Sequence, residues 1–591
     1  MTCTAELRAR LLLPLAALAA LAACGEAPAD PPPMEQARSA LAAGDGLGAE
    51  VALRSLLAEG VPQEDLAAYL GEAELQQGQL DEARRWLEPA AFSDATAGHG
   101  FHMLGRLEMR AGNLPLAGQA FDRAHGHIAD SSDLWVDIAR LRFSGGEQKQ
   151  AIEASRRAVE LDPDNPAALL LRAQLVRDSE GPAAALPWLE AGLKHAPDDL
   201  DLLGDYAATL GDAGRARDML AAVRRMAEID DRNPRLFYLQ AVLAARGGDP
   251  MLARTLLSRA GPALSESPAG MLLGGAIDIG NGNYESAAQV LDRLARMQPD
   301  NARVRELLVH ALAAGLNERE LAHRFGEGEA GDRGRPYLDH TVGRSLEAAD
   351  RREQAAPLLD RALRPVSADL LVLPTATPLE IAGRRREQGG QAVQALVRGS
   401  IQAGQAGAAV AEGERFRRRF PGSFDALVLA GDAQLAARRT QPALALYREA
   451  AGIRRPWPLA YKIALAQREL GDPGAARAGL EDFLRDNPAS GEASAELARL
   501  AAAGGEWPLV AVLTDHAIDH GGAHDPGLWR LRARAAAASG EGELAFDAAV
   551  YAYALNPLSR ESTGLLAGIA RAQGDRRLAE GLGRKLARLG A

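Results

Sequence analysis

The 591-residue sequence is poor in cysteine and in aromatic residues. Only Cys3 and Cys24 occur, which excludes a framework of several disulfides. Aromatic residues make up 4% of the chain, whereas hydrophobic residues reach 47%, with Ala and Leu supplying most of the difference. Because strands favour β-branched and aromatic side chains, this shortage argues against a β-rich fold and favours closely packed helices.

The sequence also lacks a basic excess and the common catalytic motifs. With 67 basic and 79 acidic residues, the formal charge is −12, which argues against nucleic acid as the main partner. It contains no Walker loop, H-E-x-x-H, G-x-S-x-G or C-x-x-C motif. The sequence therefore predicts a non-catalytic protein without a cofactor. Its length exceeds what one hydrophobic core supports, so we expect several domains or a repeat array.

The N-terminus has the pattern of a targeting segment. Arg8 and Arg10 precede the apolar run "LLLPLAALAALAAC", which has the length of a secretory signal and is short for a membrane span. We therefore predict a signal peptide over residues 1–23. The proline-rich stretch at residues 24–33 suits an extended linker between a membrane and a folded body.

The end of this run, Leu21-Ala22-Ala23-Cys24, resembles the lipobox of bacterial lipoproteins. The resemblance implies that Cys24 is lipidated and becomes the first residue of the mature chain. Cys3 would then be removed, leaving no disulfide or thiolate metal site. In a Gram-negative host, Gly25 after the cysteine implies an outer-membrane lipoprotein facing the periplasm. The alternatives are an ordinary signal peptide, or a soluble cytosolic scaffold whose N-terminus is merely a helix.

A second pattern begins with "GNYESAAQVLDRLARMQPDN", residues 282–301, which predicts one amphipathic helix ended by Pro299. The pattern repeats every 34 residues, with units starting at 64, 98, 132, 166, 200, 234, 268, 302 and 336. Position 20 of these units is mostly alanine: Ala83, Ala117, Ala151, Ala185, Ala253, Ala287 and Ala355, with Met219 and Leu321 as exceptions. Position 8 is mostly small: Gly71, Gly105, Ala139, Ala173, Ala207, Ala241, Gly275 and Gly343.

A second, less strictly spaced block starts at about 390, 424, 457, 491, 526 and 560. A weaker unit near residue 30 opens the array, which gives about 16 units. We therefore predict an N-terminal array at residues 34–369, a junction at 370–389 and a C-terminal array at 390–591. Pro365, Pro374 and Pro378 prevent a continuous helix around the junction, although a decayed repeat is the alternative.

These units resemble the tetratricopeptide repeat, a helix–turn–helix of 34 residues. The resemblance implies an all-α superhelical solenoid of antiparallel helix pairs with a concave inner surface. Small residues at positions 8 and 20 let paired helices approach closely. The chain departs from the family where large aromatic residues are usual, at positions 4, 11 and 24. For this reason, the units at 200–233 and 302–335 are the weakest predictions.

In this family, positions 2, 5, 9, 12 and 13 of each first helix line the concave groove. Position 9 is arginine in six units: Arg106, Arg140, Arg344, Arg398, Arg499 and Arg534. Neighbouring pairs of these arginines could bind carboxylates of an extended peptide or an acidic glycan. The alternative is that they pair with acidic residues on adjacent helices of the same chain.

Three histidines form the strongest metal candidate. His516 and His520 are four residues apart on one predicted helical face, and His524 follows two glycines. This spacing could hold zinc or copper. The alternative is a solvated helix end, where the helix dipole favours His520.

The sequence thus predicts a lipid-anchored scaffold that binds envelope proteins or extended peptides. It resembles bacterial tetratricopeptide lipoproteins attached to exopolysaccharide export systems, with the exosortase-associated (PEP-CTERM) lipoprotein as a plausible relative. The resemblance implies polysaccharide machinery as a partner. A fold does not settle function, and the alternative is a metal-dependent or glycan-modifying envelope protein that uses the His516–His524 cluster.

Overall fold

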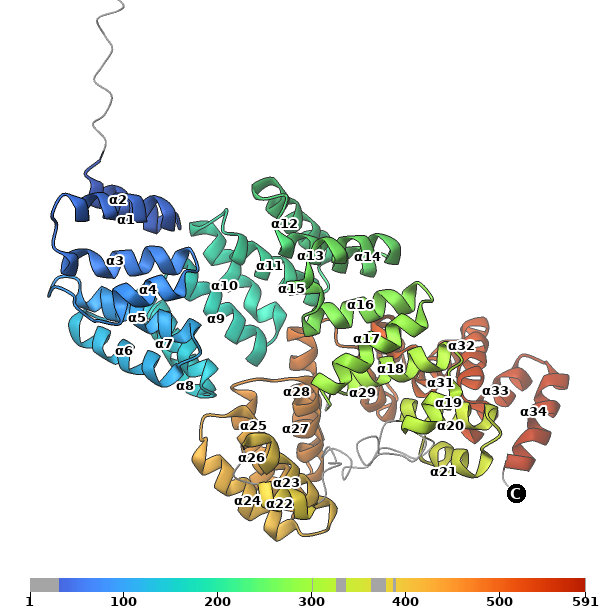
Figure 1. Ribbon diagram of the computed structural model, residues 1–591. Coiled ribbons are helices and arrows are strands. Elements are labelled where there is room, and N and C mark those ends of the chain that lie inside the picture. The colour runs from blue at the N-terminus through green and yellow to red at the C-terminus, as the bar shows by residue number, and fades with distance from the viewer. Residues whose placement is uncertain (1–30, 300, 326–335, 363–378, 386–388, 590–591) are drawn as a thin grey trace, which may run out of the picture. The chain divides into compact units, whose positions relative to one another are not determined.

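The computed structural model describes residues 31–299, 301–325, 336–362, 379–385 and 389–589 (Figure 1). The predicted signal peptide and Cys24 lie outside the described residues, as does most of the predicted junction at 370–389. Every element in the described part is helical, and no strand occurs there. The expected all-α repeat fold is therefore confirmed. None of the described helices combines the length and apolar content needed to cross a membrane.

The helices follow one another as antiparallel pairs. The first ten pairs, with the short α15 inserted among them, are α1 (Pro33–Ala42) and α2 (Gly46–Ala58), α3 (Gln63–Gln76) and α4 (Leu80–Leu87), α5 (Ala97–Arg110) and α6 (Leu114–His127), α7 (Ser132–Ser144) and α8 (Gln148–Leu161), α9 (Pro166–Ser179) and α10 (Pro182–His195), α11 (Leu200–Asp212) and α12 (Ala216–Ile229), α13 (Pro234–Arg246) and α14 (Pro250–Arg259), α15 (Pro262–Ser265), α16 (Pro268–Gly280) and α17 (Tyr284–Met297), α18 (Ala302–Ala314) and α19 (Glu318–Phe325), and α20 (Pro336–Ala348) and α21 (Arg352–Ala362).

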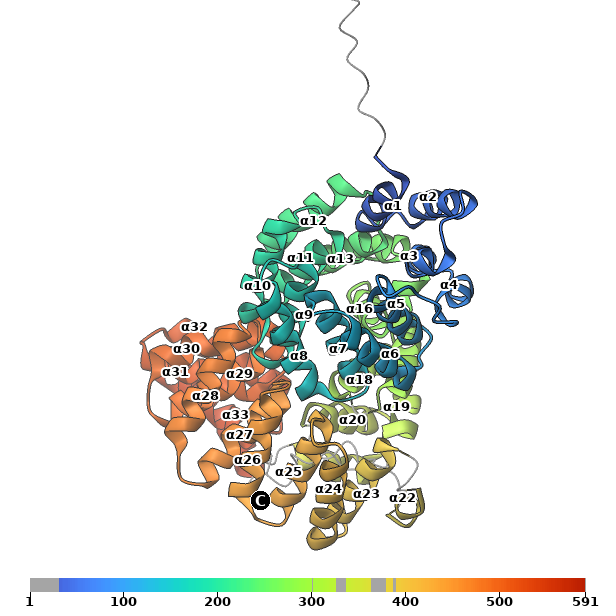
Figure 2. The same cartoon turned by 90° about the vertical axis from the view of Figure 1, so that its left-hand side faces the viewer.

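A single helix, α22, precedes six further pairs. These elements are α22 (Leu379–Arg385), α23 (Gly390–Gln402) and α24 (Ala406–Arg419), α25 (Phe424–Ala436) and α26 (Thr440–Ala451), α27 (Trp457–Glu469) and α28 (Pro473–Asp486), α29 (Gly491–Ala503) and α30 (Trp507–Ala517) with the short η3 (Ile518–Gly522), α31 (Pro526–Ala538) and α32 (Gly542–Leu555), and α33 (Arg560–Ala572) and α34 (Arg576–Leu589). Figure 1 shows α16, α17 and α18 side by side in chain order, and Figure 2 shows the same for α26, α27 and α28.

The predicted repeat register agrees with the observed helix boundaries. Each unit proposed between residues 64 and 336 begins within one residue of a first helix, and the second block agrees as closely. The weakly predicted units at 200–233 and 302–335 are also helix pairs, α11–α12 and α18–α19. The alanine at position 20 is fully buried in most units, as Ala151 and Ala287 show with 0% exposure.

The chain divides into two compact units, residues 1–141 and 142–591. The division falls inside α7, at a place that no composition change marks in the sequence. The predicted division into two arrays, on either side of residues 370–389, stays a prediction.

Two local signals fix where each pair begins and turns. The residue before the first helix often caps it with a side-chain oxygen, at a 34-residue spacing: Asn165, Asp199, Asn233, Ser267 and Asn301. Between the two helices, the residue at position 15 has a positive φ in most units, as Gly282 does at +73°. Glycine occupies this position in most units because it adopts the left-handed region without steric cost.

In several pairs, a glycine at position 8 receives a large side chain from position 24 of the second helix. A Cβ atom added to Gly105 would lie 2.3 Å from the Phe121 ring, and one added to Gly431 would lie 2.5 Å from the Tyr447 ring. Both aromatic rings are fully buried. Glycine at position 8 therefore lets the second helix bring an aromatic side chain to the helix crossing.

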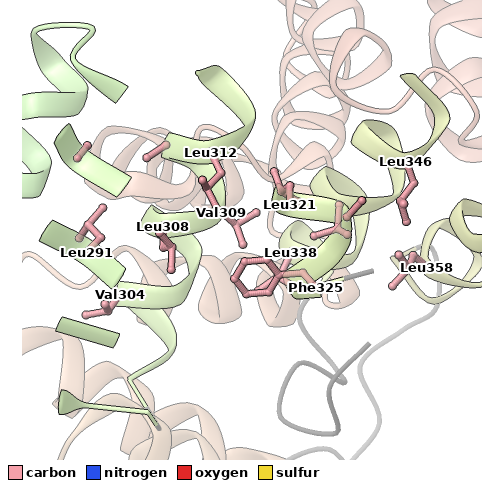
Figure 3. Packing of buried hydrophobic residues seen from close by; sticks show 14 of the residues in the cluster. Leu291, Val304, Leu308, Val309, Leu312, Leu321, Phe325, Leu338, Leu346 and Leu358 are labelled. Carbon is pink, nitrogen blue, oxygen red and sulfur yellow. The ribbon is translucent and has the colours of Figure 1, made fainter. Parts of the chain in front are cut away.

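The cores of neighbouring pairs merge into continuous apolar clusters. Figure 3 shows one such cluster, which runs from Leu291 on α17 through Leu308 on α18 and Leu321 on α19 to Leu346 and Leu358 on α20 and α21. Each buried leucine contributes roughly 1.5–3 kcal/mol relative to an exposed one. Since these side chains come from successive repeats, each pair is stabilised mainly by its neighbours.

We predict that Gly431→Ala destabilises the protein by about 1–3 kcal/mol, because its methyl group would overlap the buried Tyr447 ring. Urea unfolding measures the change. Gly568→Ala is the control, since Gly568 also lies inside a helix but has nothing within 4 Å of an added Cβ. The control should be unchanged or more stable by about 0.5–1 kcal/mol. Equal effects of the two substitutions would contradict the packing described.

Candidate binding groove

All six predicted groove arginines lie on first helices of repeats. Their positions are Arg106 on α5, Arg140 on α7, Arg344 on α20, Arg398 on α23, Arg499 on α29 and Arg534 on α31. Arg106 and Arg398 are half-buried, and the other four are exposed. Their surroundings differ.

Arg106 and Arg140 converge on one carboxylate of the same chain, that of Asp137. The Nε atom of Arg106 donates to Asp137 at 2.5 Å, and Arg140 Nη1 donates at 3.2 Å. His102 Nε2 lies 2.8 Å from the same side chain. Burial acts to raise the pKa of Asp137, but the His102 hydrogen bond and the Arg106 charge together hold it well below its usual range. Asp137 therefore binds the two arginines that were expected to bind a carboxylate of a partner molecule.

Two other arginines also meet carboxylates of their own chain. Arg344 pairs with Glu347 one turn further along α20. Arg499 lies 3.3 Å from Glu496 and 2.9 Å from Asp525. For these side chains, the geometry agrees with the alternative given above, in which the arginines pair with acidic residues of the same chain.

Arg398 differs because it lines a cleft. The cleft has a volume of about 180 Å³ and lies across the first helices α23, α25 and α27. Its lining residues are Gln394, Arg398, Phe424, Asp425, Val428, Leu429, Asp432, Pro456, Pro458, Leu459 and Lys462. Gln394 and Arg398 are positions 5 and 9 of their repeat, and Asp425, Val428 and Asp432 are positions 2, 5 and 9 of the next. The cleft thus coincides with positions that the resemblance assigned to the groove.

A buried polar network forms one wall of this cleft. Lys462 Nζ donates to Asp432 Oδ1 at 2.6 Å, and the Tyr447 hydroxyl donates to the same oxygen at 2.7 Å. Lys462 and Asp432 are 7% and 4% exposed. Burial and the nearby Asp432 charge raise the pKa of Tyr447 well above its usual value, so the hydroxyl remains a donor. The network fixes a lysine and a carboxylate at the cleft wall.

Asp432 and Lys462 were missed by the sequence analysis, which followed only arginine along position 9. Asp432 occupies position 9 of the repeat starting at 424. A search of position 9 for any charged residue, and not only for arginine, would therefore have identified it. Lys462 is harder to find, because the 33-residue spacing between the units at 424 and 457 shifts it to position 6.

The histidine cluster does not converge on one point. His516 and His520 stack with ring centroids 4.0 Å apart. Both ring nitrogens of His516 have partners, Ser494 Oγ at 2.7 Å and the Pro488 carbonyl at 2.9 Å. His524 instead packs edge-on against Tyr337, with centroids 4.5 Å apart. Among the residues that the structure describes, no group of three or more His, Cys, Asp or Glu side chains is placed to hold a metal ion.

A comparison with protein-family models agrees with the repeat architecture. Residues 34–98, 136–199 and 461–509 match the family model of the tetratricopeptide repeat. A solved structure, the crystal structure of the APC/C hetero-tetramer Cut9–Hcn1, is 13% identical with a TM-score of 0.32, and the match covers 91% of this chain and 95% of that one. A comparison with curated proteins gave no match. Tetratricopeptide repeats are therefore present in the three matched segments, and the other described residues form helix pairs as well.

We predict that Asp137→Asn destabilises the unit formed by residues 1–141 by about 2–4 kcal/mol at neutral pH, because Arg106 and His102 would lose their shared acceptor. The folded-state pKa of Asp137 is lowered, so its contribution is complete above the unfolded pKa of about 4 and declines as the pH falls below that value.

Urea unfolding at neutral and acidic pH measures this difference. The exposed Asp122 on α6 provides the control, and Asp122→Asn should change stability little at either pH. A stability gap between wild type and Asp137→Asn that widens on acidification would contradict the assignment.

Proposed function

We propose that this protein is a non-catalytic, lipid-anchored scaffold of the bacterial envelope that binds extended segments of partner proteins. The tetratricopeptide solenoid supports a role in protein–protein interaction. The N-terminal pattern ending at Cys24 supports an anchor in the outer membrane, with the repeats facing the periplasm. Partners from exopolysaccharide export or assembly fit this location.

The observation that carries the proposal is the cleft across α23, α25 and α27. Its volume of about 180 Å³ is below the roughly 300–1,000 Å³ of typical sites for small molecules and cofactors. A cleft of this size suits one or two side chains of a longer segment. Several apolar residues line it, among them Val428 and Leu459, and Arg398 and Lys462 add positive charge.

These features favour a segment with an apolar side chain next to an acidic one. The apolar side chain would lose contact with water between Leu429 and Leu459. Arg398 presents a planar guanidinium, which pairs well with a carboxylate. Asp432 pairs with Lys462, and Arg398 and Asp425 are the other charged side chains of the lining.

A photo-crosslinking amino acid at Gln394, which lines the cleft, tests the proposal in intact envelopes. We expect one or a few defined crosslinked partners, which disappear when Arg398→Glu reverses the charge of the cleft wall. The control places the same amino acid at the exposed Glu153, on the second helix α8. Identical products from both sites, or products unaffected by Arg398→Glu, would count against a specific groove.

The anchor is tested separately by metabolic labelling with a radioactive fatty acid. Wild type should incorporate the label and fractionate with the outer membrane, because the acyl chains on Cys24 add roughly 0.8 kcal/mol for each buried CH₂ group. Cys24→Ser should remain unlabelled and leave the membrane fraction. An unlabelled wild type would end the lipoprotein proposal and leave the groove proposal standing.

A further inference from the structure

Both rims of the cleft contact repeats that lie far away in the sequence. Gln148 Oε1, at the start of α8, accepts a hydrogen bond from the backbone N–H of Phe424 at 2.9 Å, across 276 residues. The neighbouring Lys149 N–H donates to the Gly422 carbonyl at 3.3 Å. Phe424 itself lines the cleft. The start of α8 therefore holds one rim.

Arg455 holds the opposite rim, next to the lining residue Pro456. Its backbone N–H donates to the Asp178 carbonyl at 2.8 Å, and its guanidinium donates to the Glu180 carbonyl at 2.9 Å. The same guanidinium donates to Asp486 at 2.6 Å. The acceptors at 178 and 180 are carbonyls at the C-terminal end of α9, where the helix dipole favours a positive charge.

Gly181 permits this approach. Its φ is +123°, and an added Cβ would lie 2.6 Å from the carbonyl oxygen of Asp486. A side chain at this position would separate the loop after α9 from the end of α28. Two longer ion pairs lie beside these contacts, Lys149 with Glu449 at 3.7 Å and Arg454 with Asp178 at 4.0 Å.

We propose that these contacts form a latch that sets the shape of the cleft and couples partner binding to its closure. The latch comprises residues 148–149 and 178–181 on one side, and 422–424, 454–455 and 486 on the other. Gln148 and Arg455 are positioning residues, since they act on the cleft through Phe424 and Pro456. This inference rests on the proposed function of the cleft.

The coupling follows from linkage. A partner that fits only the closed cleft stabilises the closed latch, and a closed latch raises the affinity for that partner by the same factor. The latch consists of a few polar contacts, and Arg455 is 22% exposed. Such contacts hold a closed state by modest free energies, so opening remains accessible and closure can respond to a ligand.

Distance measurements between spin labels test the latch without any ligand. Because Cys3 and Cys24 are the only cysteines, the chain with both changed to serine accepts two labels at chosen sites. Suitable exposed sites are Glu153 on α8 and Arg418 on α24. Wild type should give one narrow distribution of distances.

Arg455→Glu should add a longer and broader population, rising on the order of tenfold for each charge-assisted hydrogen bond lost. Arg448→Glu is the matched control, because Arg448 is an exposed arginine on the adjacent α26 and the charge change is the same. A distribution that Arg455→Glu leaves unchanged would overturn the latch.

Gly181→Ala provides a second variant that retains every charge. We expect it to open the latch, whereas Gly214→Ala should not, because Gly214 also has a positive φ but nothing within 4 Å of an added Cβ. The pair separates the close approach of Gly181 from its backbone strain. Equal distance distributions for the two variants would argue against a role of Gly181 in closure.

The coupling is tested by crosslinking from Gln394 in intact envelopes that carry each latch variant. Arg455→Glu should lower the yield of the wild-type product, and Arg448→Glu should preserve it. Absence of a product in wild type would defeat the proposed function, whatever the distance measurements show. If a variant has an open latch by the distance measurements but gives the wild-type yield of product, this result would falsify the coupling. The proposed function would not be affected.

Discussion

The close crossing of two helices within each repeat is the constraint on which the rest of the structure depends. In several repeats a glycine at position 8 faces a large side chain at position 24, as Gly431 faces Tyr447, and in most repeats a buried alanine occupies position 20. Because such a crossing tolerates little change in volume, successive pairs recur at intervals of close to 34 residues. The same positions of successive first helices then recur on one face, which brings side chains from three repeats to one cleft.

That face contains buried carboxylates whose charges are neutralised locally. Asp205 on α11 illustrates the pattern, with Gln174 and Arg177 on the preceding first helix and Arg235 on the following one. Such interactions join repeats, since a buried carboxylate without a partner would be costly. An arginine at a groove position therefore often pairs with a carboxylate of its own chain. Arg398 is distinguished by the cleft that it lines.

The sequence was sufficient to predict the repeat boundaries because the signals for them are local and periodic. Pro166, Pro234 and Pro268 each begin a first helix at the expected residue. The caps before these helices were an unused signal of the same kind. The groove positions stay a prediction, and the surroundings of an arginine at position 9 can depend on a residue one repeat away, as Arg106 depends on Asp137 across 31 residues. Arginine at position 9 alone could not distinguish an internal partner from an external one.

The contact between Gln148 and Phe424 has no counterpart in the repeat pattern, so it could not be predicted from that pattern. Closing a flexible loop of 276 residues would cost about 5 kcal/mol in chain entropy, more than a few polar contacts supply. The described repeats between these residues are folded, however, so most of that entropy is lost when the array forms. The free energy of the latch contacts then has to offset only the cost of the small bending of the folded array that brings the two rims together. Because the open and closed states then differ little in free energy, a partner segment bound between the rims can shift the population toward the closed state. A stronger or more extensive contact would keep the latch closed without a partner.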